Sequence, residues 1–139
     1  MLHISMITLG VRDVAASTAF YEALGLTKSG ASQESVTFFQ AGPCVLGLFG
    51  RDDLAEDGNA GDLWSGNGGF SVAYNVASRE AVEQMIAKAE EIGATILKQP
   101  QEVFWGGYHG YFTDPDGHIW EIAHNPFFPV DEKGAVTLP

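Results

Sequence analysis

The sequence has little of the chemistry that builds covalent crosslinks or cysteine-rich metal sites. Among its 139 residues there is one cysteine, Cys44, and there are four histidines. A single cysteine can form neither a disulfide within the chain nor a cysteine-built metal site. Low cysteine content is typical of a reducing compartment, so we expect a cytoplasmic location.

Positive charge and long apolar runs are also scarce. The chain has 7 lysine and arginine residues against 18 aspartate and glutamate residues, a formal net charge of −11 with histidine neutral. Such an acidic chain repels nucleic-acid phosphates and anionic lipids. No apolar run approaches the length of a bilayer span, and we see no charged-then-apolar leader. We therefore expect neither a nucleic-acid partner nor a membrane partner.

Hydrophobic residues make up 45% of the chain, enough for a packed core, and their pattern divides it into two similar halves. In the first half, residues 14–24 predict a helix that Asp13 caps and Gly25 ends. In the second half, a helical stripe over residues 81–92 follows Ser78, a favourable N-cap. Strands are predicted at residues 4–11, 26–29, 35–40 and 44–49 of the first half and at residues 70–76, 94–98, 108–113 and 118–123 of the second.

Both halves thus have the order strand–helix–strand–strand–strand, at an offset of roughly 65 residues, which indicates a duplicated module. We predict an α+β fold of two βαβββ modules, at residues 1–50 and 69–125. Residues 51–68 are acidic and read as a solvated linker, in which Trp64 anchors the loop on the core. The tail, residues 126–139, is part of the same structural domain. Its phenylalanines beside prolines pack either on that domain or on a second subunit, and we expect a homodimer.

Two segments carry a resemblance to a known family. The first joins ITLGVRDV at residues 7–14 to AFYEALGL at residues 19–26, and the second is GYFTDPDGHIWEI at residues 110–122. Together they resemble the vicinal oxygen chelate superfamily of glyoxalases, bleomycin-resistance proteins and extradiol dioxygenases. The resemblance covers residues 2–125.

The resemblance implies that the curved sheets of the two modules form an open, barrel-like cavity, with the helices on the convex side. It also implies that a small molecule binds in this cavity. Many members hold a divalent metal there on four side chains, typically His, Gln or Glu, from the first and last strands of each module. Other members hold no metal and sequester a drug.

The four ligand positions implied by the resemblance fall on Met6, Gly47, Ser71 and Glu121. A hard divalent ion needs several oxygen or nitrogen donors, which Met6 and Gly47 do not offer from their side chains. Strand alternation places none of the four histidines on the face of Glu121. We therefore expect no metal and no other cofactor, with a weakly held divalent ion on Glu121 as the alternative.

A four-residue turn at residues 114–117 would pair Gly110 with Glu121 and place Tyr108 diagonal to Glu121 on the concave face. In an apolar cavity a carboxylate can exchange a proton near neutral pH, so Glu121 and Tyr108 are the candidate catalytic residues. The alternative is a structural role for both. The candidate ligand-binding residues, from strand alternation and from the aromatic loop before the last hairpin, are Met6, Thr8, Val45, Phe49, Trp105 and again Tyr108.

These features are compatible with three functions. The first is a protein that binds a neutral or cationic, partly aromatic small molecule in the cavity without the family metal. The second is a lyase, isomerase or epimerase that uses Glu121 as general base, with or without a weakly held metal. The third is a scaffold that has lost its chemistry. The few arginines weigh against a glutathione substrate, because its carboxylates need cationic partners.

Overall fold

The fold is taken from a computed structural model, which describes residues 2–61 and 69–138. The chain divides into two compact units, Met1–Gly68 and Gly69–Pro139. Trp64 and the rest of residues 62–68 lie outside the described residues, and so does the predicted anchoring role of Trp64. No helix in the described part of the chain has both the length and the apolar character that a membrane span requires.

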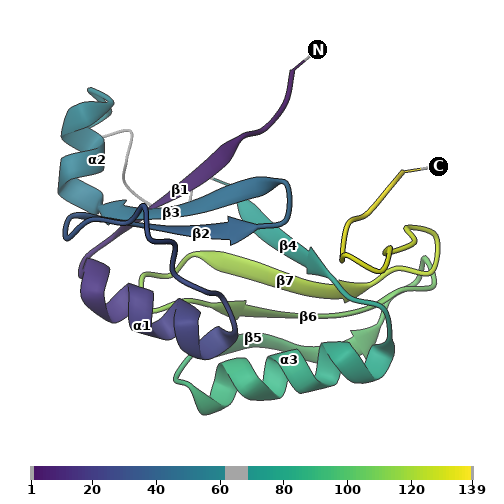
Figure 1. Cartoon of the computed structure of the whole chain (residues 1–139). Helices are drawn as coiled ribbons and strands as arrows, with labels where there is room; N and C mark the ends of the chain where they lie inside the picture. The colour runs from purple at the N-terminus through teal and green to yellow at the C-terminus, as the bar shows by residue number, and fades with distance from the viewer. Residues whose placement is uncertain (1, 62–68, 139) are drawn as a thin grey trace. The chain divides into compact units, whose positions relative to one another are not determined.

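The first unit is built on a three-stranded sheet (Figure 1). Strands β1 (Met6–Val11) and β3 (Cys44–Gly50) are parallel neighbours, and β2 (Val36–Ala41) pairs with β3 in the antiparallel sense. Helix α1 (Val14–Leu24) follows β1 and contacts β2 and β3. The first and last strands of the predicted module therefore lie side by side in the sheet.

Helix α1 begins and ends where the sequence predicts. The side chain of Asp13 accepts a hydrogen bond from a backbone N–H of the first turn, and Gly25 follows the helix with a φ of 125°, a conformation that favours glycine. On its buried side Tyr21 is fully covered, and the Thr18 hydroxyl shares a hydrogen bond of 2.8 Å with the Thr37 hydroxyl of β2. The cap residues and the apolar stripe together fix this helix against the sheet.

Two parts of the first unit differ from the sequence-based prediction. Residues 26–29 form no strand, and only Lys28 makes an isolated bridge, to Phe39 of β2. The segment predicted as a solvated linker begins instead with helix α2 (Arg51–Asp57). Two aspartates lie in its first turn, where the free N–H groups of a helix N-terminus favour negative charge. Acidic composition that is typical of a solvated loop is therefore also suited to starting a helix.

The second unit contains the complete predicted module. Its elements are β4 (Ser71–Asn75), α3 (Arg79–Glu91), β5 (Thr95–Glu102), β6 (Tyr108–Thr113) and β7 (Ile119–His124). The sheet order is β4-β7-β6-β5, with β4 parallel to β7 and the other pairs antiparallel. As in the first unit, the first and last strands are parallel neighbours.

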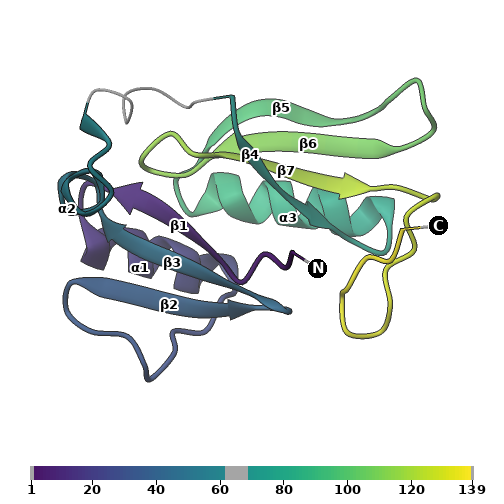
Figure 2. The same ribbon diagram turned by 90° about the horizontal axis from the view of Figure 1, so that it is seen from above.

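Helix α3 lies across one face of this four-stranded sheet (Figure 2). Ser78 is its N-cap, as predicted, because its hydroxyl oxygen accepts a hydrogen bond of 3.1 Å from the Ala81 N–H. The buried side chains of the helix and of the sheet strands that it contacts include those of Val82, Ile86, Ala89, Phe112 and Ile122. The described residues thus form an α+β protein with two mixed sheets, the fold class that the sequence predicts.

The hairpin between β6 and β7 is closed by five residues, not four. The Asp114 carboxylate accepts hydrogen bonds from the N–H groups of Asp116 and His118 at 2.9 and 2.8 Å. The Asp114 N–H also donates to the His118 carbonyl oxygen at 3.0 Å, which adds His118 to the turn. Because side chains alternate along a strand, one extra turn residue exchanges the partners on each face.

The register predicted for this hairpin is therefore wrong by one residue. Tyr111 lies opposite Glu121, and Gly110 pairs with Ile122. The expected pairing of Gly110 with Glu121 does not form, and Tyr108 pairs with His124 at the far end of the hairpin. The side chains that share a face with Glu121 are consequently those of the odd-numbered residues of β6.

The tail belongs to the second unit. Val130 and Val136 form an isolated antiparallel bridge, and the Phe127 ring lies beside Gly106 of the same unit. Phe127 is nevertheless 63% exposed and Phe128 is 36% exposed. The tail therefore packs in part on its own unit, and the homodimer stays a prediction.

Candidate functional site

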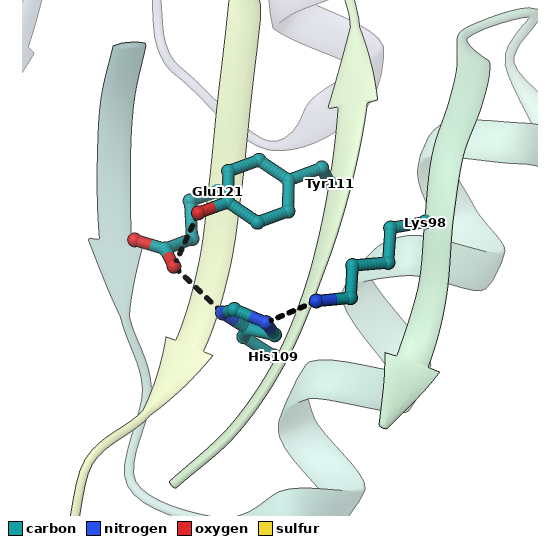
Figure 3. A network of polar contacts seen from close by, with 4 residues as sticks. All are labelled: Lys98, His109, Tyr111 and Glu121. Atoms are coloured by element: carbon teal, nitrogen blue, oxygen red, sulfur yellow. Dashed lines mark hydrogen bonds and ion pairs between the residues drawn. The ribbon is translucent and has the colours of Figure 1, made fainter. Parts of the chain in front are cut away.

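Three polar side chains converge on the face of the second sheet opposite α3. Glu121 lies on β7, and His109 and Tyr111 lie on the neighbouring strand β6. His109 Nδ1 is 2.8 Å from Glu121 Oε2, and the Tyr111 hydroxyl donates to the same oxygen at 2.9 Å. Figure 3 shows the other carboxylate oxygen of Glu121 turned away from both partners. One oxygen is thus held by two neighbours, and the other points away from them.

A fourth side chain, Lys98 of β5, extends the cluster. Its Nζ lies 2.9 Å from His109 Nε2, on the side of the imidazole away from Glu121 (Figure 3). In a regular ladder Lys98 would pair with Gly110, two residues along from the pair of Ile96 with Phe112, and would face α3. A bulge between Ile96 and Lys98 shifts the register, so Lys98 pairs with Tyr111 and joins the opposite face.

Aromatic rings continue the cluster toward the loop before β6. The Trp105 ring meets the His109 ring edge-on at 6.5 Å between centroids, and His109 meets Tyr111 in the same manner at 5.1 Å. The Trp105 indole lies against the backbone of Gly107, where a Cβ would stand only 2.0 Å from a ring carbon. Glycine at this position therefore lets Trp105 lie next to the polar cluster. Phe104, which precedes it, is fully exposed.

Burial within this cluster affects the protonation of Tyr111. The Glu121 side chain is 22% exposed and that of His109 is 10% exposed, so both interact in a partly desolvated setting. Burial, followed by the hydrogen bond to Glu121, raises the pKa of Tyr111 to about 12. Tyr111 therefore keeps its proton at neutral pH and acts as a donor to the carboxylate.

Tyr108, predicted as the partner of Glu121, lies on the other face of the sheet. Its hydroxyl donates to Glu83 of α3 at 2.7 Å, and the Arg79 guanidinium stands 5.0 Å from its ring centroid. The hydrogen bond to Glu83 is the largest cause that raises the pKa of Tyr108. The predicted Tyr108–Glu121 pair is therefore wrong, because the five-residue turn places Tyr111 where Tyr108 was expected to act.

Gly110 does not leave space above the Glu121 carboxylate, as the predicted register required. It faces α3, where a Cβ would stand 2.9 Å from the Lys98 carbonyl oxygen and 3.0 Å from Ile86 Cγ1. The missing side chain lets the helix and the bulged strand β5 approach β6 closely. Gly110 thus contributes to the position of Lys98 and not to room for a ligand.

The ligand-binding candidates of the first unit share one face of its sheet. Met6 pairs with Val45, and Thr8 pairs with Gly47. Phe49 lies two positions after Gly47 and therefore on the same face. The buried residues of these strands, such as Leu9 and Leu48, alternate with them and occupy the opposite face. The alternation predicted for these four candidates is therefore present, and their contact with a ligand stays a prediction.

The residues at the implied metal-ligand positions do not form the donor set of the family. Met6 and Gly47 share a face in the first unit, and Ser71 and Glu121 share one in the second. A thioether, a glycine, a hydroxyl and one carboxylate do not satisfy a hard divalent ion, and Glu121 Oε2 already interacts with His109. Within the described residues, no group of three His, Cys, Asp or Glu side chains could hold a metal ion.

Sequence reasoning missed three members of the cluster, namely Lys98, His109 and Tyr111. His109 was assigned to the face opposite Glu121 by an argument that depended on the turn length. The signal that could have corrected it is Asp114, whose side chain stabilises a longer turn through two backbone N–H groups. For Lys98 the signal is Pro100 in β5, because proline in a strand is typical of an edge or a bulge.

The chain matches the family model described as Glyoxalase/Bleomycin resistance protein/Dioxygenase superfamily over residues 3–122. No curated protein matches it. Among solved structures, it is similar to a glyoxalase-related enzyme from Fulvimarina pelagi, with 32% identity and a TM-score of 0.89 over 99% of both chains.

Two more distant structures share the fold. A glyoxalase/bleomycin resistance protein/dioxygenase family enzyme from Burkholderia phytofirmans PsJN is 23% identical, with a TM-score of 0.78 over 88% of this chain and 98% of that one. Lactoylglutathione lyase from Agrobacterium tumefaciens is 20% identical, with a TM-score of 0.67 over 88% of this chain and 93% of that one. The family model, the relative with 32% identity and the shared fold lead to one conclusion: the chain belongs to the glyoxalase/bleomycin resistance protein/dioxygenase superfamily.

Proposed function

We propose that this chain binds a small organic molecule on the sheet face that carries Glu121, and that it does so without a family metal. The observation that carries the proposal is the geometry of the carboxylate. Oε2 is held by His109 and Tyr111, whereas the other oxygen points away from the cluster (Figure 3). A carboxylate fixed on one side is a pre-oriented hydrogen-bond acceptor on the other.

The surroundings favour a ligand that is neutral or cationic and partly aromatic. Trp105 stands at one end of the cluster and offers a flat apolar surface. Cationic groups for an anionic ligand are scarce. Arg79 pairs with Glu102 at 2.7 Å on the α3 side of the sheet, and the Lys98 ammonium is directed at His109. A ligand with several carboxylates would therefore find few partners here.

Calorimetric titration of chelator-treated protein tests this function. The probes are a cationic glycopeptide of the bleomycin class and S-lactoylglutathione, an anionic thioester. We expect the glycopeptide to bind more tightly, and Glu121→Gln to weaken its binding about tenfold, the effect of losing one charge-assisted hydrogen bond. Glu83→Gln is the matched control, because Glu83 lies on the α3 side and should leave the affinity unchanged. Tighter binding of the thioester, or binding only after a divalent metal is restored, would contradict the proposal.

A second candidate function is catalysis by Glu121 as general base, in a lyase, isomerase or epimerase reaction. The observation that favours it is the contact between Glu121 and His109, since an imidazole beside a carboxylate can orient it for proton transfer. In this case Glu121→Gln abolishes turnover while the fold and the affinity for substrate persist. Retained turnover in that variant would contradict catalysis by Glu121.

A further inference from the structure

Lys98, His109 and Glu121 form a continuous chain of polar contacts across three neighbouring strands. The Lys98 Nζ lies 2.9 Å from His109 Nε2, and His109 Nδ1 lies 2.8 Å from Glu121 Oε2. The strand order β7-β6-β5 places each residue on the next strand along. The imidazole therefore lies between the Lys98 amine and the Glu121 carboxylate, and each ring nitrogen faces one of these two groups (Figure 3).

This geometry allows one proton arrangement at low cost. A lysine ammonium has three donors and no acceptor, so the nitrogen that faces Lys98 must accept a hydrogen bond. The single proton of a neutral imidazole then sits on Nδ1 and points at Glu121. The opposite arrangement, with the proton on Nε2, would direct an N–H at the Lys98 ammonium and require Lys98 to be neutral. Amines are much stronger bases than imidazoles and carboxylates, so an arrangement that takes the proton from the lysine is disfavoured.

Tyr111 completes the arrangement from the same face. Its hydroxyl donates to Glu121 Oε2, and burial, followed by this hydrogen bond, raises the pKa of Tyr111 to about 12. With the imidazole proton on Nδ1, Glu121 Oε2 receives two hydrogen bonds, one from His109 and one from Tyr111.

We propose that Lys98 is a positioning residue that acts on Glu121 through His109. Its ammonium fixes the His109 tautomer with the proton on Nδ1, and that tautomer orients Glu121 as a carboxylate with one oxygen available. The Lys98 ammonium supplies the positive end of this network. The inference rests on the proposed role of Glu121 in ligand binding, and it concerns how that carboxylate is held.

The test is the ¹⁵N spectrum of the His109 ring in the ligand-free protein, assigned by its loss in His109→Gln. We expect a proton on Nδ1 and none on Nε2 at neutral pH. In Lys98→Met the Nε2 resonance should move, because this nitrogen loses its donor. It should stay in place in Lys98→Arg, which keeps a cationic donor, and in Lys88→Met, a control on the exposed side of α3. A purely structural role of Lys98 would not separate the arginine variant from the methionine variant in this way.

Two results would overturn the inference. One is a wild-type ring with its proton on Nε2 or on both nitrogens, which can be seen even if the variants fail to fold. The other is a His109 Nε2 resonance with the same chemical shift in Lys98→Met as in the control Lys88→Met. Titration with the cationic glycopeptide is the second readout, and we expect about a tenfold loss of affinity in Lys98→Met and recovery in Lys98→Arg. Because the spectrum needs no ligand, the proton arrangement and the proposed binding function can fail separately.

Discussion

Tyr111 lies directly opposite Glu121 on the neighbouring strand, and its hydroxyl donates to Glu121 Oε2 at 2.9 Å. Directly paired residues on one sheet face are close enough for their side chains to act together. In the proposed function, this pair and His109 on the same strand hold Glu121 as a hydrogen-bond acceptor. The function that we propose follows from this pairing and not from the carboxylate alone.

Removal of the Tyr111 hydroxyl should weaken ligand binding. Tyr111→Phe deletes one hydrogen bond to the carboxylate, so we expect the Kd for the cationic glycopeptide to rise about tenfold. Tyr108→Phe is the matched control, because the Tyr108 hydroxyl donates to Glu83 on the other sheet face. Calorimetric titration measures both variants, and an equal effect of the two would contradict the placement of the site.

Alkaline pH should destabilise the protein in a defined window. The unfolded chain releases the Tyr111 proton near the ordinary value of 10, whereas the folded protein holds it up to about 12. The folded state binds more protons within this window, so the free energy of unfolding falls as the pH rises through it. Urea denaturation at stepped pH should show a shallower fall for Tyr111→Phe than for the wild type. Identical slopes would contradict the raised pKa of Tyr111.

A methyl group at Gly107 should displace Trp105 without deleting it. The Cβ of Gly107→Ala would stand 2.0 Å from the indole, so the ring must leave its present position beside His109. We expect about a fivefold loss of affinity for the partly aromatic glycopeptide, similar to that of Trp105→Ala. Gly30→Ala, where a Cβ meets nothing within 4 Å, is the control. If Gly107→Ala binds as tightly as Gly30→Ala, Trp105 is not part of the site.

A methyl group at Gly110 should destabilise the second unit. Its Cβ would stand 2.9 Å from the Lys98 carbonyl oxygen and 3.0 Å from Ile86 Cγ1, and neither can retreat freely from the packed interior. Overpacking of this kind costs about 1–3 kcal/mol in the free energy of unfolding. Urea denaturation of Gly110→Ala beside Gly30→Ala measures the cost. Equal stability of the two variants would mean that α3 and β5 do not approach β6 as closely as described.

Much of the fold could be predicted from the sequence, because local signals determine it. Asp13 and Gly25 fix the ends of α1, Ser78 starts α3, and each of these three signals acts within one helical turn. The α+β class follows from the order of the elements. The missed α2 is acidic, and nothing in its composition separates a solvated loop from a short helix.

The site could be predicted only in part, because it depends on strand register. Glu121 is marked by the family motif, but its partners are set by whether the hairpin turn has four or five residues, which Asp114 decides through its side-chain hydrogen bonds. Lys98 reaches the cluster only through a bulge in β5, which changes the face on which the side chain lies, and a second register shift follows between Lys98 and Gln101. One-residue shifts of this kind leave little trace in composition or periodicity.

The most direct test of the central claim, a carboxylate held by hydrogen bonds in place of a metal, is elemental analysis after equilibrium dialysis. Wild-type protein and Glu121→Gln are dialysed against zinc, nickel and manganese and then against metal-free buffer. We predict that both retain far less than one ion per chain and that they do not differ. About one ion per chain in the wild type, lost in Glu121→Gln, would contradict the account.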